Sequence, residues 1–253
     1  MLKTGIRISL AQIPVVKGNV VENLSNHLTM IAQSSLYGAN VVVFPELSLT
    51  GYELELAQEL AFSPQSPHFS ALSRASIEND IVVIAGCPLN IKSSAKPTIG
   101  AVICFPDGTI EFYSKQYLHE GEGTFCASGS EDYVFNVEGH RIGLAICADF
   151  SSTAHSLNAR MLGADIYIAS ALISDSGFEA DAKILSHIAS KHRFPVLLSN
   201  HISSTGGWSA CGNNTIWNAS GDVVLSSASK EHCLVMCSIN GHEVYAAQVQ
   251  QIT

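Results

Sequence analysis

Strand-like and helix-like segments alternate along almost the whole of this 253-residue chain, and that alternation is the strongest constraint on its fold. Residues 6–13 are apolar and strand-like, whereas residues 20–37 carry apolar side chains at the three- and four-residue spacing of an amphipathic helix. Gly38 then ends the helix, and residues 41–44 are again typical of a strand. The chain is therefore predicted to be an α/β protein.

The number of predicted strands indicates more than one sheet. About a dozen strands accompany only four long helices, which favours two sheets packed together and covered by helices in one domain of residues 1–253. Residues from about 240 to 253 are predicted to form a loosely packed tail or an arm onto another subunit. The remaining predicted helices are 67–79, one ending near Gly163, and 178–193, and the remaining strands are 81–87, 99–105, 109–114, 133–137, one leading to Cys147, 166–171, 196–199, 209–217, 223–227 and 233–239.

The composition argues against several classes of protein. The chain is 47% hydrophobic and 14% charged, which favours buried strands and an apolar subunit interface. No uninterrupted apolar stretch reaches the roughly 18 residues of a membrane span. A net charge of −9 argues against nucleic acid and anionic membranes as partners. The expected partner is a small molecule.

The cysteine content predicts reduced thiols rather than a disulfide framework. Seven cysteines occur in a chain of this length, and the odd number agrees with free thiols. The first residues run directly into a strand pattern without a secretory signal. We therefore expect a cytoplasmic protein.

Three of the predicted strands end in a reactive side chain. Glu46 directly follows the apolar run Val-Val-Val-Phe-Pro, and partial burial there raises a carboxyl pKa toward the range of proton exchange at neutral pH. Lys115 lies at the end of a hairpin strand. Cys147 follows the apolar run 142–146, and a sharp turn there would expose one thiol beside a free backbone N–H.

Each of these three groups alone has an ordinary structural explanation, as a cap, a solvated charge or a small core residue. Together they are the groups that an acyl-transfer enzyme needs. A thiolate attacks, a carboxylate takes and returns protons, and an ammonium stabilises the oxyanion and lowers the pKa of the thiol. We therefore predict a cysteine hydrolase that acts on a carbon–nitrogen bond.

The motifs around these three groups resemble those of the nitrilase, or carbon–nitrogen hydrolase, superfamily, and the resemblance covers essentially the whole chain. All three motifs occur in order and with suitable spacing. They are Phe44-Pro45-Glu46 followed by Thr50-Gly51-Tyr52, Ser114-Lys115 with Leu118 three positions later, and Gly-Leu-Ala-Ile-Cys-Ala-Asp at 143–149. Later matches to the superfamily are Gly163-Ala164-Asp165, Ser199-Asn200 and the stretch 212–221.

The resemblance implies a four-layer α-β-β-α sandwich of the nitrilase type, in an amidase-like branch, that forms a homodimer or higher homo-oligomer. It implies Cys147 as nucleophile, Glu46 as general base and acid, and Lys115 with the Ala148 backbone N–H as the oxyanion hole. Hydrolysis would run through a thioester: ammonia or an amine leaves first, and water activated by Glu46 then releases the carboxylic acid. The resemblance implies no metal and no organic cofactor.

Many members of the superfamily use a second glutamate a few residues after the lysine. Glu122 is the first candidate, with Glu120 as the alternative, and either could instead be a solvated acid of the loop. Further candidates for the substrate pocket are Tyr52, His155, Ser170, Ala171, Asn200, His201, Trp208 and the loop 175–177.

The chain departs from the common pattern of the superfamily near the predicted pocket. Ala148 replaces an aromatic residue, and Ser170 replaces the usual proline. The triplet Cys-Ala-Asp differs from the Cys-Trp-Glu of true nitrilases, which favours a small amide or N-carbamoyl substrate over a nitrile. Amide hydrolysis, carbamoyl hydrolysis and other acyl transfer stay open.

Three alternative functions compete with this prediction. A catalytically silent relative could serve as a binding or scaffold protein. A metal site could use His119 and Cys126, although the chain has no Cys-x-x-Cys, His-x-x-x-His or His-Glu-x-x-His spacing. A cysteine–histidine dyad is conceivable, but no histidine has a local context as suggestive as that of Glu46.

Overall fold

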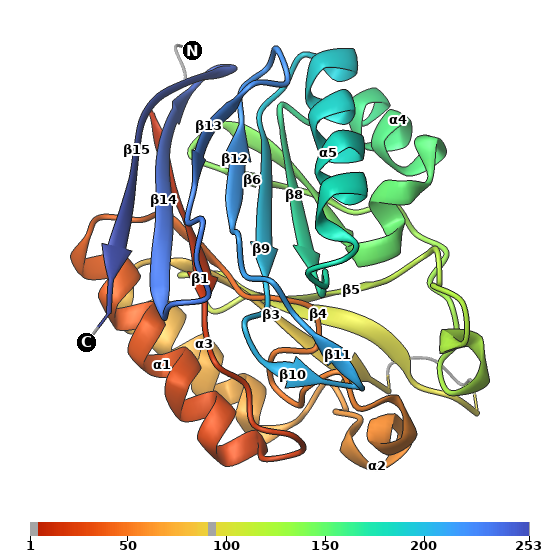
Figure 1. Cartoon of the computed structure of the whole chain (residues 1–253). Helices are drawn as coiled ribbons and strands as arrows, with labels where there is room; N and C mark the ends of the chain where they lie inside the picture. Colours follow the sequence, from red (N-terminus) through yellow and green to blue (C-terminus); the bar gives the residue numbers. More distant parts are fainter. Residues whose placement is uncertain (1–4, 91–94, 253) are drawn as a thin grey trace.

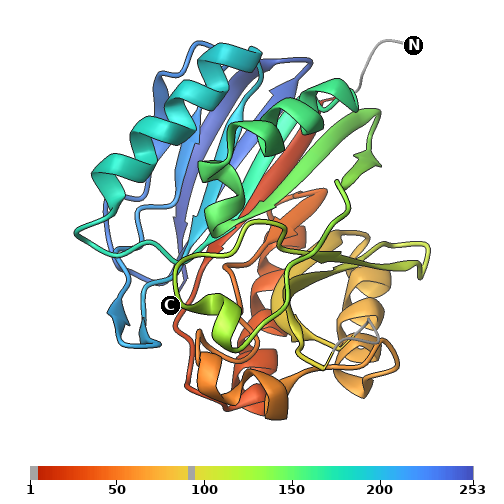
Figure 2. The same cartoon turned by 90° about the vertical axis from the view of Figure 1, so that its right-hand side faces the viewer.

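The computed structural model of the chain describes residues 5–90 and 95–252, and the two large sheets within them pack between two layers of helices (Figures 1 and 2). The first and last residues of the predicted domain 1–253 lie outside the described residues. The seven-stranded sheet has the order β15 (Glu243–Gln251), β14 (Cys233–Asn240), β1 (Ile6–Gln12), β2 (Val41–Val43), β3 (Val82–Leu89), β4 (Thr98–Cys104) and β5 (Ile110–Ser114). The six-stranded sheet has the order β13 (Val223–Ser226), β12 (Thr215–Trp217), β9 (Val196–Asn200), β8 (Ile166–Ala171), β7 (His140–Ile146) and β6 (Val134–Val137).

The long helices cover the outer faces of the two sheets. Met30 of α1 (Val20–Leu36) and Leu72 of α3 (Pro67–Asn79) lie in an apolar cluster with the seven-stranded sheet. Leu185 of α5 (Phe178–His192) and Ala159 of α4 (Thr153–Met161) lie in a second cluster with the six-stranded sheet. A third cluster fills the space between the sheets. Burial of apolar surface in these three clusters stabilises the α-β-β-α sandwich that the sequence predicts, and this prediction is confirmed.

Local signals in the sequence explain where the first long helices begin and end. The Asn19 side chain accepts a hydrogen bond from the backbone N–H of Glu22 at the start of α1, and Gly38 follows the helix with a φ of +75°. Ser66 caps α3, and Pro67 fills its first position. None of the helices in the described ranges is both long and apolar enough to cross a lipid bilayer.

Two segments differ from the prediction. The expected loose tail is instead the edge strand β15, which pairs antiparallel with β14 and packs Val244 and Val249 against the core between the sheets. The predicted strand 209–217 is broken into β11 (Trp208–Ser209), which pairs with β10 (Ser204–Thr205), and β12. Gly212 and Asn213 have positive φ values between β11 and β12, and an extended strand does not pass through that conformation. The short helices that the sequence analysis did not predict are η1 (Leu54–Leu56), α2 (Ala57–Leu60), η2 (Glu122–Thr124) and η3 (Cys147–Ser151).

Hydrogen bonds between the two sheets fix the end of β2, just before Glu46. The Ser170 hydroxyl of β8 donates to the Phe44 carbonyl at 2.8 Å, and the Ser199 hydroxyl of β9 donates to the Val43 carbonyl at 3.1 Å. Both hydroxyls lie in buried side chains, where an unpaired polar group is costly. These contacts hold the glutamate-bearing segment over the ends of β8 and β9.

A glycine on the neighbouring strand lets the Glu46 segment approach the sheet. A Cβ atom on Gly86 of β3 would lie 2.4 Å from both the Leu47 nitrogen and the Pro45 carbonyl oxygen. Any larger residue would therefore displace the turn that carries Glu46.

Candidate active site

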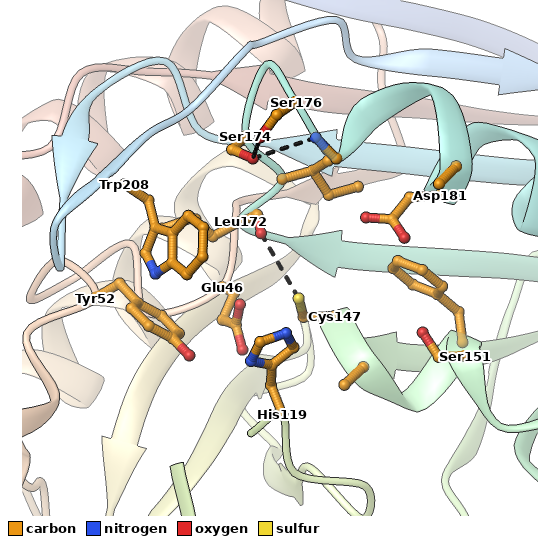
Figure 3. Close-up of a pocket in the computed structure, with 15 residues that line it drawn as sticks. Glu46, Tyr52, His119, Cys147, Ser151, Leu172, Ser174, Ser176, Asp181 and Trp208 are labelled. Carbon is orange, nitrogen blue, oxygen red and sulfur yellow. Dashed lines mark hydrogen bonds between the residues drawn. The ribbon is translucent and has the colours of Figure 1, made fainter. Parts of the chain in front are cut away.

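Cys147 lies where β7 ends and the short helix η3 begins. Its φ of 45° is in the left-handed region, so the chain turns sharply at this residue and its side chain is only partly buried. The thiol lines a cavity of about 360 Å³ and donates to the Leu172 carbonyl at 3.7 Å (Figure 3). This is the strand-to-turn geometry that the sequence predicts for the nucleophile.

Lys115 joins the two glutamates in a fully buried ion cluster. Its Nζ donates to Glu46 Oε1 at 2.8 Å and to Glu122 Oε1 at 2.7 Å. Burial lowers the pKa of this ammonium, but the negative charges of Glu46 and Glu122 outweigh that effect and raise its pKa above the ordinary value. Lys115 is therefore protonated at neutral pH.

Glu122 is held in place by two further donors. The Tyr52 hydroxyl donates to Glu122 Oε1 at 2.5 Å, and the His119 backbone N–H donates to Oε2 at 2.6 Å. Glu120, the alternative from the sequence, is exposed and does not reach Lys115. The geometry thus brings Glu122, and not Glu120, into the cluster.

Glu46 keeps one carboxylate oxygen free of protein partners. Oε1 accepts from Lys115, whereas the buried Oε2 has no hydrogen-bond partner among the described residues. The glutamate lines the same cavity as Cys147, and Figure 3 shows the two side chains together. Burial is the largest cause of a raised Glu46 pKa, and Lys115 only partly offsets it. Such a carboxyl group is suited to exchange a proton with the thiol.

The Cys147 thiol is protonated in the free protein. Burial raises its pKa well above the usual value and the charge of Glu46 raises it further, while Lys115 only partly offsets this. Lys115 does act in the direction that the sequence analysis expects, but the net shift is upward. Any reaction through a thiolate at this position therefore requires proton transfer from the thiol to a base.

Asp149, which the sequence analysis assigned no role, connects the lysine segment to the nucleophile turn. Its Oδ1 accepts from the backbone N–H groups of Gln116 and Tyr117, both at 2.9 Å. Its Oδ2 accepts from the Ile146 N–H at 2.9 Å and from the Tyr113 hydroxyl at 2.7 Å. A carboxylate two residues after the cysteine was visible in the sequence, but three of its four partners come from the distant strand β5 and the residues that follow it.

The Asp149→Ala variant should lose both stability and activity, because four donors lose their acceptor. We expect the free energy of unfolding to fall by about 3 kcal/mol or more, and kcat to fall by about tenfold or more because Lys115 is no longer positioned against Cys147. Denaturant unfolding and steady-state kinetics measure both effects. Asp132→Ala is the control, since that carboxylate is exposed and accepts hydrogen bonds from the side chains of Gln116 and Asn158 rather than from backbone N–H groups that the structure describes. Equal losses in the two variants would contradict the positioning role.

Three of the predicted pocket residues line the cavity. These are Tyr52, Ala148 and Trp208. The Ala148 N–H lies in the first turn of η3, where N–H groups have no partner within the helix. In the loop 175–177, which the sequence also places at the pocket, Ser176 and Gly177 line the cavity.

The other predicted pocket residues lie behind the cavity and do not line it. His155 is buried between the hydroxyls of Tyr113 and Tyr167, at 2.9 and 2.8 Å. His201 donates from Nε2 to the Glu46 carbonyl at 2.5 Å, and burial lowers its pKa to about 4, so it supports the glutamate turn as a neutral ring. Ser170 and Ala171 are buried strand residues of β8.

Asn200 likewise has a supporting position. Its Oδ1 accepts from the Ile173 N–H at 2.7 Å, and its Nδ2 donates to the Ile173 carbonyl at 3.1 Å and to the Gly212 carbonyl at 2.8 Å. These bonds fix the loop after β8, which forms one wall of the cavity. Contrary to the prediction, none of these five residues lines the cavity.

Several residues that line the cavity carried no signal in the sequence. They come from the loop between β5 and η2, from η3, from the loop after β8 and from the start of α5, and the tertiary fold alone brings them to Cys147. They are His119, Phe150, Ser151, Leu172, Ile173, Ser174, Ala180 and Asp181.

The metal alternative receives no support from the side-chain positions. Among residues 5–90 and 95–252, no three His, Cys, Asp or Glu residues are placed to share a metal ion. Cys126 is buried, whereas His119 lines the cavity.

The fold and this site define a class of protein, and comparison with known families identifies it. The profile described as carbon–nitrogen hydrolase matches residues 7–248, so this chain belongs to the carbon–nitrogen hydrolase family. The predicted family and the enzyme class that it defines are thereby confirmed. The fold is also similar to the crystal structure of an amidase from Nesterenkonia sp., with a TM-score of 0.84, 19% sequence identity and coverage of 93% of this chain and 90% of that chain.

The alignments with two curated relatives cover only part of the length of those proteins. A glutamine-dependent NAD(+) synthetase of Xylella fastidiosa is 30% identical over 165 residues, which cover 57% of this chain and 27% of the synthetase. A 2-oxoglutaramate amidase of Bacillus subtilis is 28% identical over 144 residues, which cover 56% of this chain and 55% of the amidase. The matches thus span about a quarter of the synthetase and about half of the amidase.

Proposed function

We propose that this protein hydrolyses the carbon–nitrogen bond of a small amide or N-carbamoyl compound through a thioester on Cys147. The observation that carries the proposal is the convergence of three elements on one cavity. Glu46 presents an unpartnered buried oxygen beside Cys147, and Lys115 is held against Glu46 by a hydrogen bond of 2.8 Å. The curated relatives include both an amidase and a nitrilase, and the triplet Cys-Ala-Asp at 147–149 favours an amide over a nitrile.

Acylation begins with transfer of the thiol proton from Cys147 to Glu46. The sulfur adds to the substrate carbonyl carbon, and the oxygen that becomes negative is stabilised by Lys115 and the Ala148 N–H. Glu46 then gives its proton to the leaving nitrogen, so ammonia or an amine departs and the thioester remains.

Deacylation uses Glu46 again, first as a base toward water and then as an acid toward the sulfur. A water molecule takes the place of the leaving amine and loses a proton to Glu46 as its oxygen attacks the thioester carbonyl. The second tetrahedral intermediate collapses to the carboxylic acid, and the proton returns from Glu46 to the sulfur. Glu122 and the Tyr52 hydroxyl keep the Lys115 ammonium directed at the reacting oxygen throughout.

Glu46→Gln tests the proton-transfer role, because the amide has the shape of the carboxylate but cannot accept the thiol proton. We expect kcat/KM for a small amide to fall by about 10²–10⁴-fold, measured as ammonia release. In the unmodified enzyme, burial raises the pKa of Glu46. The base must be ionised, so activity should fall as the pH drops through an apparent pKa above that of an ordinary glutamate. Activity in Glu46→Gln equal to that of the unmodified enzyme would refute the assignment.

The alternative of a catalytically silent binding or scaffold protein is less well supported. A buried cluster of two carboxylates and one ammonium is costly to desolvate, and a protein without catalysis has little use for it. The alternative would gain if the folded protein released no ammonia from any small amide and if Cys147 did not react with iodoacetamide at neutral pH.

The assembly and the location of the protein stay predictions. A homodimer or higher homo-oligomer is supported by three exposed apolar side chains at α4 and just after it, Leu157, Met161 and Leu162. A cytoplasmic location is an expectation from the sequence alone.

A further inference from the structure

One acidic side chain in the cavity takes no part in the proposed mechanism. Asp181 lies in the first turn of α5 and lines the same cavity as Cys147. Figure 3 draws its carboxylate on the cavity side, across Cys147 from Tyr52 and Trp208. Its partial burial raises its pKa, and His119 partly offsets this. No hydrogen bond to the carboxylate is formed by the side chains that the structure describes.

The cavity offers no fixed positive charge to an anionic substrate. Among the described residues that line it there is no lysine or arginine, and Lys115 behind it is already paired with two carboxylates. The positive end of α5 faces its own Asp181, which would repel a second carboxylate. Ser174 and Ser176 add hydroxyl oxygens to the same wall. The Asp181 carboxylate and these two hydroxyl oxygens are suited to accept hydrogen bonds from a cation.

The neighbouring cavity has the same sign of charge. It has a volume of about 450 Å³ and shares Tyr52, His119 and Trp208 with the reactive cavity. Three carboxylates line it, and within residues 5–90 and 95–252 only that of Glu53 forms an ion pair, with Lys17 at 3.1 Å. The exposed Glu55 and Glu120 therefore give this outer cavity a negative potential, which attracts cations toward the site.

We propose that the substrate is an amide whose acyl chain ends in a protonated amine, and that Asp181 binds this ammonium while Cys147 attacks the amide carbon. This assignment of the substrate class rests on the proposed amidase function. The reaction is the hydrolysis already described: the amide and one water give an ω-amino acid and ammonia. A cavity of about 360 Å³ has the volume of about a dozen water molecules, so only a short chain fits between the two groups.

The test compares amides that differ only in the terminal group. Each ω-amino amide is matched with the neutral amide in which a methyl group replaces the ammonium, namely 3-aminopropanamide with butanamide, 4-aminobutanamide with pentanamide, and 5-aminopentanamide with hexanamide. Succinamate supplies a negative terminus. For at least one pair, kcat/KM should favour the amine by roughly 10- to 100-fold, the range of a hydrogen bond between charged groups. Succinamate should be the poorest substrate.

Two variants separate the role of Asp181 from a general effect of charge. Asp181→Asn keeps the shape of the side chain and should reduce the ratio of amine to neutral kcat/KM to near one. Asp175→Asn makes the same change in net charge at an exposed residue that does not line the cavity and pairs with Lys230 at 2.7 Å, so the ratio should persist. A ratio that is unchanged in Asp181→Asn would overturn the proposal.

The outcomes for the unmodified enzyme distinguish this proposal from the one on which it rests. Rapid hydrolysis of the neutral amides or of succinamate, without preference for the amines, would overturn the ammonium site and leave the amidase function standing. No hydrolysis of any amide, together with an unreactive Cys147, would overturn the amidase function and the ammonium site together.

Discussion

Cys147→Ala should abolish turnover, with kcat for a small amide reduced by at least about 10⁴-fold. In this variant Ala148 still lines the cavity and Lys115 still lies behind it, but no atom remains to form the covalent bond. The fold should be unaffected, because alanine differs from cysteine only by the sulfur atom and this side chain is partly exposed. Ammonia release and thermal unfolding measure the two effects.

Two further variants control for this result. Cys147→Ser should also retain little activity, since a hydroxyl is much harder to ionise than a thiol beside the same glutamate. Cys104→Ala removes a sulfur atom from β4, where it is buried against the helix layer away from the cavity, and kcat should be unchanged. Substantial amide hydrolysis by Cys147→Ala would exclude the cysteine as the nucleophile.

Lys115→Met should cause the largest combined loss of activity and stability. The variant loses the ammonium that stabilises the oxyanion, which should reduce kcat by about 100-fold or more. It also leaves Glu46 and Glu122 buried side by side without their cation, which should lower the free energy of unfolding by about 3–5 kcal/mol. Steady-state kinetics and denaturant unfolding measure the two effects.

The stability loss in Lys115→Met should depend on pH in a defined direction. Without the ammonium, the already raised pKa of Glu46 rises further, so the folded state holds a proton that the unfolded state releases. The stability of the variant therefore falls as the pH rises from the Glu46 pKa of the unfolded state to the higher pKa of the folded state. The loss of stability relative to the unmodified protein is consequently smaller in acid. The triple variant that adds Glu46→Gln and Glu122→Gln removes the uncompensated charges and should regain stability without activity. A loss in Lys115→Met that does not depend on pH would contradict this account.

The sequence predicts the layers of the fold because its main elements carry strong local signals. The helix α1 has a cap, an apolar face and a terminating glycine, and the strands of the cores are continuous apolar runs. The edge strand β15 was missed because only its half-buried residues, such as Val244 and Val249, face the core, and its exposed positions are polar or small except for Tyr245. The pairing with β14 that defines this strand is a long-range contact that local pattern does not contain.

The convergence of Glu46, Lys115 and Cys147 was predictable because each of them lies just after the end of a strand. The walls of the cavity were not predictable from the sequence, because they come from loops whose positions depend on distant contacts. His155 shows the reason: its position near the cysteine in sequence suggested the pocket, but α4 directs it inward between two tyrosine hydroxyls. Asp181 is the converse case, a residue distant in sequence that the packing of α5 brings to the cavity.

The most direct test of the account is the intact mass of the protein, acid-quenched during turnover of a small amide. We predict a species heavier by the acyl group without the amide nitrogen, located on Cys147 by peptide mapping and released by hydroxylamine. Such a species should be absent from Cys147→Ala. Acylation of a different residue, or an adduct that retains the amide nitrogen, would contradict a thioester route.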